Sequence, residues 1–394
     1  MRRLLIVNNC PSHYRTFMFN KMNDKGKEYG IEVTLAFQGE TEPHRPWSPD
    51  QYDMQFPYFI SSGINPWKRG NHRDFTAGTF NTDILQRVMF GGYDWVLMAP
   101  FMSVGTWAMA LAPSRKTKKL LWSESNFASA RYLRGPVRLF KRVLQSPFDI
   151  LVCPGQRAVD YVCHFNPRLA QKPVLWLPNI VDTALYDRQV RRHREHREAI
   201  RTKLGVASDE ILAFGVGRMI ERKGFHLLIE AVAQVEGRYK VIILGDGPLR
   251  EPWLERIAEL GIGDRIRLPG QADSSEVTQH LCAADWFLHT ALQDPSPLVI
   301  VEATVAGLPM AVSVQTGNGP EGVEEGQNGF TYDPTDPAAM VGALKRIVTS
   351  SADDRTRMAR RSARLAQERF EPDGIVDRFF QGLLEHSAGT GVSR

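Results

Sequence analysis

The stretch Ile211-Leu-Ala-Phe-Gly-Val216, followed by Gly217-Arg218-Met-Ile-Glu-Arg-Lys223-Gly224-Phe225, sets the plan of the whole chain. Its first six residues form a short apolar run, which predicts a buried strand. Residues 225–234 have the spacing of an amphipathic helix, and a glycine with two cations lies between strand and helix. This order is the repeating unit of a parallel sheet covered on both faces. We therefore expect an α/β protein.

The same alternation extends over almost the entire chain. In the first half, strands are expected at Leu4–Val7, Val33–Phe37, Trp95–Met98, Leu120–Trp122 and Ile150–Cys153. In the second half, strands are expected at Ile211–Val216, Val241–Leu244, Ile266–Leu268, Trp286–Leu288 and Met310–Val312, and helices at Phe225–Gln234, Leu249–Leu260 and Leu298–Ala306. Two doubly wound sheets are predicted, with ligands at the carboxyl ends of their strands.

The length of 394 residues exceeds what one ordinary core supports. A densely charged stretch, residues 188–203, separates the two series of strands. We expect a Rossmann-like domain at 1–182 and a second at 183–372. Residues 373–394 should form a helix that crosses back onto the first domain.

Composition excludes several classes of protein. No run of about 18 apolar residues is present to span a bilayer, and Met1-Arg-Arg-Leu-Leu-Ile-Val7 is typical of a buried strand rather than a signal peptide. The four cysteines include no Cys-x-x-Cys pair, which favours reduced thiols in a cytoplasmic protein and gives no indication of a metal site. The net charge of +5 is grouped, which favours an anionic ligand or surface.

The turn after Val216 has the composition of a phosphate cradle. Gly217 lets the backbone approach a ligand closely, Arg218 can grip two oxygens, and Lys223 adds a point charge. The alternative is a solvated, charged turn. A second glycine turn, Gly245-Asp-Gly247-Pro248, follows the neighbouring strand.

Two carboxylates flank the start of a later helix, in Asp294-Pro-Ser296-Pro-Leu298-Val299-Ile-Val-Glu302. The prolines end the preceding loop, so the helix should begin near Leu298 and offer free N–H groups to an anion. Glu302, one turn further on, suits ribose hydroxyls. The alternative is a capped helix with two surface acids.

These motifs, in order, resemble the family 4 glycosyltransferases, strongly over about residues 178–335. The residues that carry the resemblance are Gly217-Arg218…Lys223-Gly224, Gly245-Asp-Gly247-Pro248, Asp294…Glu302-Ala with Gly307-Leu-Pro309, and Gly319-Pro-Glu321…Asn328-Gly329. The family implies a GT-B architecture, a nucleoside-diphosphate sugar donor, UDP- or GDP-linked, and retention of anomeric configuration, without a metal or other cofactor. By this resemblance Arg218 and Lys223 hold the diphosphate, Glu302 the ribose and Asp294 the transferred sugar. Gly217, Gly245, Gly247, Ser296, Leu298 and Val299 complete the expected donor site.

Two positions depart from the family pattern. Asp294 is one methylene shorter than the usual glutamate, and Pro297 replaces a glycine and has no N–H to offer. Ser296 and the N–H groups of Leu298 and Val299 could compensate.

On the first domain, the opening loop and the end of Leu120–Ser123 are candidates for contact with the acceptor or the donor sugar. The residues concerned are Ser12, His13, Tyr14, Arg15, Glu124 and Asn126. For Glu124, the alternative is a loop cap.

Two basic groups, Arg115–Lys119 and Arg131–Leu144, leave two interpretations open. The second group mixes cations with apolar residues, as on a helix at an anionic membrane surface, or its apolar face packs on the first sheet. No recognised module accompanies them, so nucleic acid is not an expected partner.

The sequence as a whole predicts a cytoplasmic retaining glycosyltransferase, with attachment to the inner membrane face as an open alternative. It would move a hexose-like sugar to a hydroxyl of a saccharide, lipid-linked or small-molecule acceptor, in bacterial polysaccharide, lipopolysaccharide or glycolipid assembly. A hydrolysing sugar-nucleotide 2-epimerase and a non-catalytic sugar-nucleotide-binding protein are the rival hypotheses. A Rossmann oxidoreductase is disfavoured because residues 7–12 contain no glycine.

Overall fold

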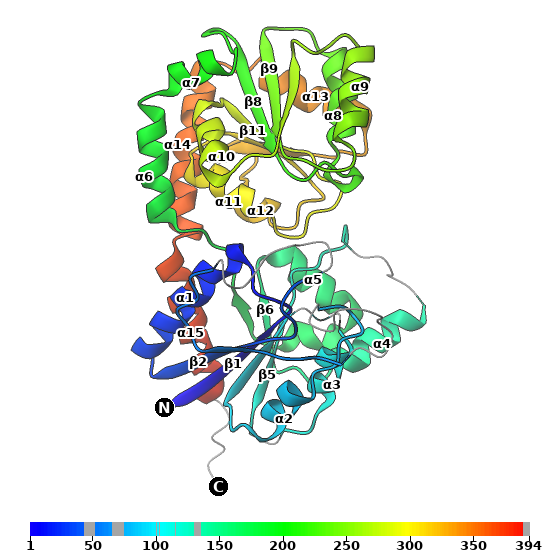
Figure 1. Ribbon diagram of the computed structural model, residues 1–394, viewed down its shortest axis with the longest axis vertical. Coiled ribbons are helices and arrows are strands. Elements are labelled where there is room, and N and C mark those ends of the chain that lie inside the picture. Colours follow the sequence, from blue (N-terminus) through cyan, green and yellow to red (C-terminus); the bar gives the residue numbers. More distant parts are fainter. Residues whose placement is uncertain are drawn as a thin grey trace. The chain divides into compact units, whose positions relative to one another are not determined.

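A computed structural model describes residues 1–42, 52–64, 75–99, 101, 103–114, 116–129 and 135–388. The chain divides into two compact units (Figure 1). Unit 1 comprises Met1–Asn179 and Pro372–Arg394, and unit 2 comprises Ile180–Glu371.

Unit 1 contains a seven-stranded parallel sheet in the order β3-β2-β1-β4-β5-β6-β7. The strands are β1 (Arg2–Asn8), β2 (Ile31–Phe37), β3 (Tyr58–Ile60), β4 (Trp95–Met98), β5 (Lys118–Trp122), β6 (Ile150–Cys153) and β7 (Val174–Trp176). All five strands expected in this half are present. The edge strands β3 and β7 were missed because three residues are too few to show a pattern.

Helices cover both faces of the first sheet. They are α1 (His13–Glu28), α2 (Thr82–Phe90), α3 (Val104–Leu111), α4 (Pro136–Gln145), α5 (Gln156–Phe165) and α15 (Pro372–Ala388), with a short 3-10 helix at Pro167–Gln171. The last of these comes from the far end of the chain. Phe380 of α15 stacks on Tyr29 at 5.7 Å, and Ser387 accepts a 2.8 Å hydrogen bond from the indole of Trp95. The predicted return of the C-terminal helix to the first domain is thus confirmed.

Unit 2 contains a six-stranded parallel sheet in the order β10-β9-β8-β11-β12-β13. Its strands are β8 (Ile211–Val216), β9 (Tyr239–Leu244), β10 (Ile266–Gly270), β11 (Trp286–His289), β12 (Met310–Ser313) and β13 (Gly329–Tyr332). The predicted class of two Rossmann-like sheets is confirmed. Strand β13 was not predicted.

Two groups of helices enclose the second sheet, and each buries its own apolar cluster (Figure 1). One group is α8 (Phe225–Gln234), α9 (Arg250–Glu259) and α13 (Pro337–Val348), and the other is α6 (Thr183–Arg194), α7 (Arg197–Lys203), α10 (Ser274–Ala283), α11 (Leu298–Val305) and α14 (Ala352–Arg369). The strand order reverses between β8 and β11. The loops after these two strands therefore lie on either side of the switch point, where ligands of such sheets bind.

None of the helices in the described ranges is long and apolar enough to cross a bilayer.

A buried arginine anchors α7 to the amino-terminal ends of β8 and β11. Arg201 is 2% exposed and donates 3.0 Å hydrogen bonds to the Asp285 carboxylate and the Ala283 carbonyl. The same carboxylate accepts from the Leu212 N–H at 2.8 Å. Removing the guanidinium would leave a largely buried carboxylate short of a partner, which is costly.

We expect Arg201→Met to lower the free energy of unfolding of unit 2 by about 3 kcal/mol. Hydrogen exchange at the β8 and β11 amides measures this loss locally. Arg191→Met, which removes an exposed ion pair to Asp187, serves as the control and should change stability by less than about 0.5 kcal/mol. Equal effects of the two substitutions would contradict the anchoring role.

Candidate functional site

The loop after β8 forms the predicted phosphate cradle. It passes through Gly217 and Arg218 into a 3-10 turn at Glu221–Lys223 and then into α8. The Lys223 side chain lies across Gly217, where an added methyl group would be 3.4 Å from Lys223 Cε. Arg218 is exposed and forms no ion pair within the described part of the chain. Its guanidinium is therefore available to a ligand.

The second glycine turn packs against the cradle. A methyl group at Gly245, where φ is +134°, would lie 2.0 Å from the carbonyl oxygen of Gly217, and one at Gly247 would lie 2.5 Å from that of Met219. The Met219 N–H donates to the Asp246 carbonyl at 2.8 Å. Contact between these loops accounts for the two glycines. Their predicted role in ligand contact stays a prediction.

An ion pair joins the cradle to the loop after β11. Lys223 Nζ lies 2.5 Å from Asp294 Oδ2, and the Thr290 hydroxyl donates to the Lys223 carbonyl at 2.7 Å. Both charged side chains are largely buried. Burial by itself would raise the pKa of Asp294, but Lys223 and His289 more than offset it and hold that pKa well below its usual range. The carboxylate is therefore ionised at neutral pH.

His289, the last residue of β11, is a member of this cluster that the sequence did not single out. Its Nε2 lies 3.4 Å from Asp294 Oδ2, and the residue is 2% exposed. Burial lowers the pKa of His289, and the charge of Asp294 opposes that shift. The available signal was its position, since a polar side chain at the carboxyl end of a strand beside the switch point faces the ligand edge.

Helix α11 begins at Leu298, as predicted, and Pro297 is its N-cap. The Pro297 carbonyl accepts from the Ile300 N–H at 3.3 Å and from the Asn318 side chain at 3.1 Å. The N–H groups of Leu298 and Val299 meet no acceptor among the described residues. The helix start is therefore braced from behind and has two donors for an anion.

Glu302 lies one turn into α11, beside Tyr186 of α6. Protein surrounds its carboxyl group, yet the side chain retains some exposure to solvent, as at the floor of a depression. Burial raises the pKa of Glu302 to about 7. A carboxyl group in this environment accepts hydrogen bonds from ligand hydroxyls well, because little water competes for it.

On unit 1, two of the candidate residues come together. Arg15 forms a 2.8 Å ion pair with Glu124, and its guanidinium lies 4.3 Å above the Trp122 ring. Ser12 precedes α1 and accepts N–H bonds through its carbonyl, while Asn126 accepts from the Ser129 N–H at 2.8 Å within a turn. The side chains of His13 and Tyr14 lie outside the described part of the structure. Contact of these residues with an acceptor stays a prediction.

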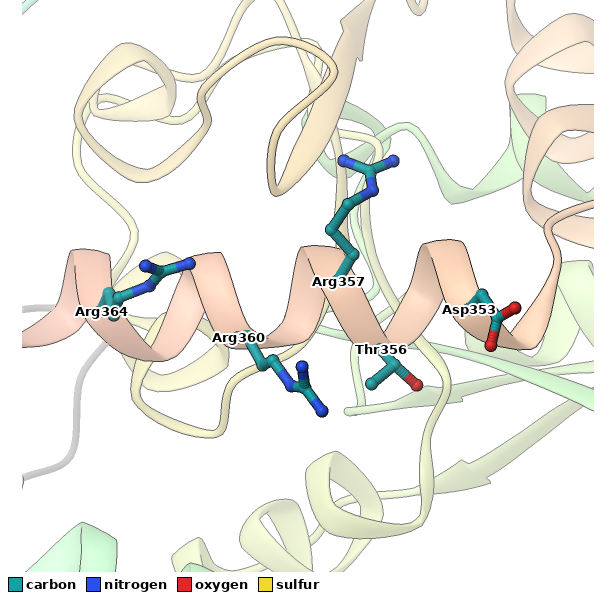
Figure 2. Close-up of a pocket in the computed structure, with 5 residues that line it drawn as sticks. All are labelled: Asp353, Thr356, Arg357, Arg360 and Arg364. Carbon is teal, nitrogen blue, oxygen red and sulfur yellow. The ribbon is translucent and has the colours of Figure 1, made fainter.

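A shallow depression of about 370 Å³ runs along α14 (Figure 2). It is lined by Asp353, Thr356, Arg357, Arg360 and Arg364. The three arginines are exposed, and none of the predicted site residues takes part. Within the described ranges, no group of three His, Cys, Asp or Glu side chains could hold a metal ion.

Comparisons with known proteins bear on both halves of the chain. The family model for group 1 glycosyl transferases matches residues 196–365. The lipopolysaccharide core biosynthesis glycosyltransferase LpsE of Rhizobium meliloti (strain 1021) is 34% identical over 184 residues, which are 46% of this chain and 52% of LpsE. Its counterpart LpsD from the same organism is 30% identical over 189 residues, 48% of this chain and 53% of LpsD. The chain thus spans about half the length of these curated relatives.

A similarity in structure covers almost the whole chain. The crystal structure of Anabaena HepE in complex with UDP superposes with a TM-score of 0.73 at 17% identity, covering 98% of this chain and all of HepE. At this identity the likeness concerns the fold, and it confirms the two-domain class expected from the sequence.

We expect Gly245→Ala to destabilise unit 2 by about 3 kcal/mol or more, because the added methyl group meets backbone at 2.0 Å and φ is unfavourable. Chemical denaturation measures the loss. Gly342→Ala in α13, where nothing lies within 4 Å, is the control and should be neutral or stabilising by up to about 1 kcal/mol. Equal stability of the two variants would contradict close packing of the loops.

The raised pKa of Glu302 predicts a pH dependence of stability. The folded state keeps this proton up to pH 7, whereas the unfolded chain loses it near 4.5, so stability should fall as pH rises between these values, by at most about 3 kcal/mol. Denaturation of wild type and Glu302→Gln between pH 4.5 and 8 isolates this contribution as their difference. A difference that does not vary with pH would show that the Glu302 pKa is not raised.

Proposed function

We propose, since residues 196–365 belong to the group 1 glycosyl transferases, that this chain is a nucleotide-sugar-dependent glycosyltransferase. One arrangement in unit 2 carries the proposal. Arg218, Lys223 and the free N–H groups at the start of α11 lie in the loops on either side of the switch point. Glu302 follows one turn beyond. These groups match a diphosphate with an attached ribose.

The cations and the helix start would stabilise the leaving group. As the bond between sugar and diphosphate breaks, negative charge grows on the phosphate oxygens. Fixed donors aimed at that charge stabilise the transition state more than the ground state. Glu302 would accept hydrogen bonds from the ribose hydroxyls.

The ion pair between Lys223 and Asp294 gives donor binding a defined exchange of partners. A diphosphate entering the cradle offers Lys223 a second anion, and Asp294 can then accept a hydroxyl of the transferred hexose. His289 stays beside Asp294 and limits the cost of this exchange. In a retaining, front-face reaction a departing phosphate oxygen takes the proton of the acceptor, so no protein base is required.

The relatives suggest the substrates. LpsE and LpsD are lipopolysaccharide core glycosyltransferases, and HepE binds UDP. We therefore extend the proposal to a UDP-linked donor and to an acceptor hydroxyl on a growing cell-surface saccharide. The ion pair of Arg15 with Glu124 on unit 1 is the candidate acceptor contact.

We expect Arg218→Ala to lower the transfer rate about a hundred-fold or more, as the loss of one donor does at preorganised anion sites. The measurement is turnover with UDP-sugars and a saccharide acceptor, after thermal-shift selection of the nucleotide among UDP, GDP, ADP and TDP. Arg222→Ala, on the same turn, is the matched control, because that exposed side chain donates only to the Gln293 carbonyl.

Three outcomes would contradict the proposal. Free sugar released without an acceptor would identify a hydrolysing enzyme instead. Nucleotide binding without turnover across acceptors would indicate a non-catalytic binding protein. Normal turnover of Arg218→Ala would remove that residue from the mechanism.

A further inference from the structure

The positive charge of the chain is concentrated in one segment. Residues 95–148 contain nine lysines or arginines and one acid, Glu124, which gives a net charge of +8 against +5 for all 394 residues. The rest of the chain is therefore slightly acidic. Helix α4 (Pro136–Gln145) lies in this segment and has no acidic residue. An anionic partner is expected here on charge alone.

Helix α4 leaves its apolar side exposed. Leu139, Phe140 and Val143 are 65%, 48% and 52% exposed, although they form one continuous strip of the helix surface. The helix attaches to unit 1 through a different edge, where Leu144 is buried and Lys141 donates to the Tyr161 hydroxyl at 2.7 Å. The interpretation that the apolar face packs on the first sheet is therefore wrong for these three residues.

The exposed apolar strip continues onto α3 and is bordered by cations. Phe140 meets Trp107 of α3 edge to face at 5.0 Å, and Leu111 at the end of α3 is 52% exposed. Arg138 and Arg142 lie one turn apart on the polar side of α4, and both are exposed. Neither pairs with a carboxylate within the described ranges. Arg138 donates to the His164 carbonyl at 3.3 Å.

We propose that α4, with Leu111, is a docking surface for an anionic lipid bilayer. Leucine, phenylalanine and valine enter the boundary between headgroups and acyl chains, and flanking arginines reach back to lipid phosphates. A nucleic acid or an acidic protein surface would match the charge but leave these apolar side chains in water. A second copy of the chain would bring the same cations against one another. The lipid surface alone satisfies both features.

The test uses the full-length protein and sedimentation with vesicles of phosphatidylcholine, with and without 30% phosphatidylglycerol. We expect binding to the anionic vesicles that weakens with salt, and weaker binding to the neutral ones. Arg138→Gln and Arg142→Gln should each reduce partitioning about five-fold, the equivalent of roughly 1 kcal/mol per cation. Leu139→Gln with Val143→Gln should reduce it at least ten-fold. All four side chains are exposed, so folding should be unaffected.

Matched controls lie elsewhere on the surface. Arg360→Gln with Arg364→Gln removes two exposed arginines from the stripe on α14, which lies in unit 2 (Figure 2). Phe90→Gln removes an exposed aromatic side chain, 77% accessible, at the end of α2. Both controls should bind anionic vesicles like the wild type.

Several results would overturn the proposal. They are failure of the wild type to bind anionic vesicles, unchanged binding of the α4 variants, and equal losses in the controls. A dimer in sedimentation equilibrium that the α4 substitutions dissociate would assign the surface to a second copy instead. The proposal rests on α4 and not on the proposed transfer reaction. Vesicle binding without activity, or activity without vesicle binding, would therefore separate the two.

Discussion

The ion pair between Lys223 and Asp294 is the contact on which the candidate site depends. A parallel sheet covered on both faces sends its polar loops to one edge, and this pair joins the two loops at the switch point of the second sheet. Both groups are largely buried, so each needs the other to remain charged. The cradle after β8 and the start of α11 are thereby held in register without a ligand. His289 contributes a second neighbour to the shared carboxylate.

Backbone contacts hold this frame, and the groups that face a ligand are left unoccupied. Gly224, at φ +70°, comes so close to the Thr290 carbonyl that a methyl group there would lie 2.2 Å away. Asn318 fixes the Pro297 carbonyl from behind the helix start. The Arg218 guanidinium, in contrast, extends into solvent. Such a division suits a site whose donors must be aligned before charge develops on a leaving group.

The sequence predicted the strands of the interior and most of the frame, because buried parallel strands appear as continuous apolar runs. It missed β3 and β7, which are short edge strands, and β13, in which glycine and threonine interrupt the apolar pattern. It placed Lys223 on the phosphate and Asp294 on the sugar as separate contacts. Their pairing joins positions 71 residues apart and follows from the crossover of the chain, which no local pattern contains. The same holds for the exposed face of α4, since an amphipathic sequence does not reveal which side the domain covers.

The return of α15 to unit 1 has a consequence for the order of events during synthesis. Residues 1–179 leave the ribosome before any of unit 2, but the helix that completes their fold comes after residue 371. Its buried side chains are Ile375, Val376, Phe379, Phe380 and Leu383. At ordinary translation rates the surface they cover stays open to water for roughly ten to forty seconds. The nascent first domain is therefore a client for chaperones during that interval, and the last turns of the chain decide when it is released.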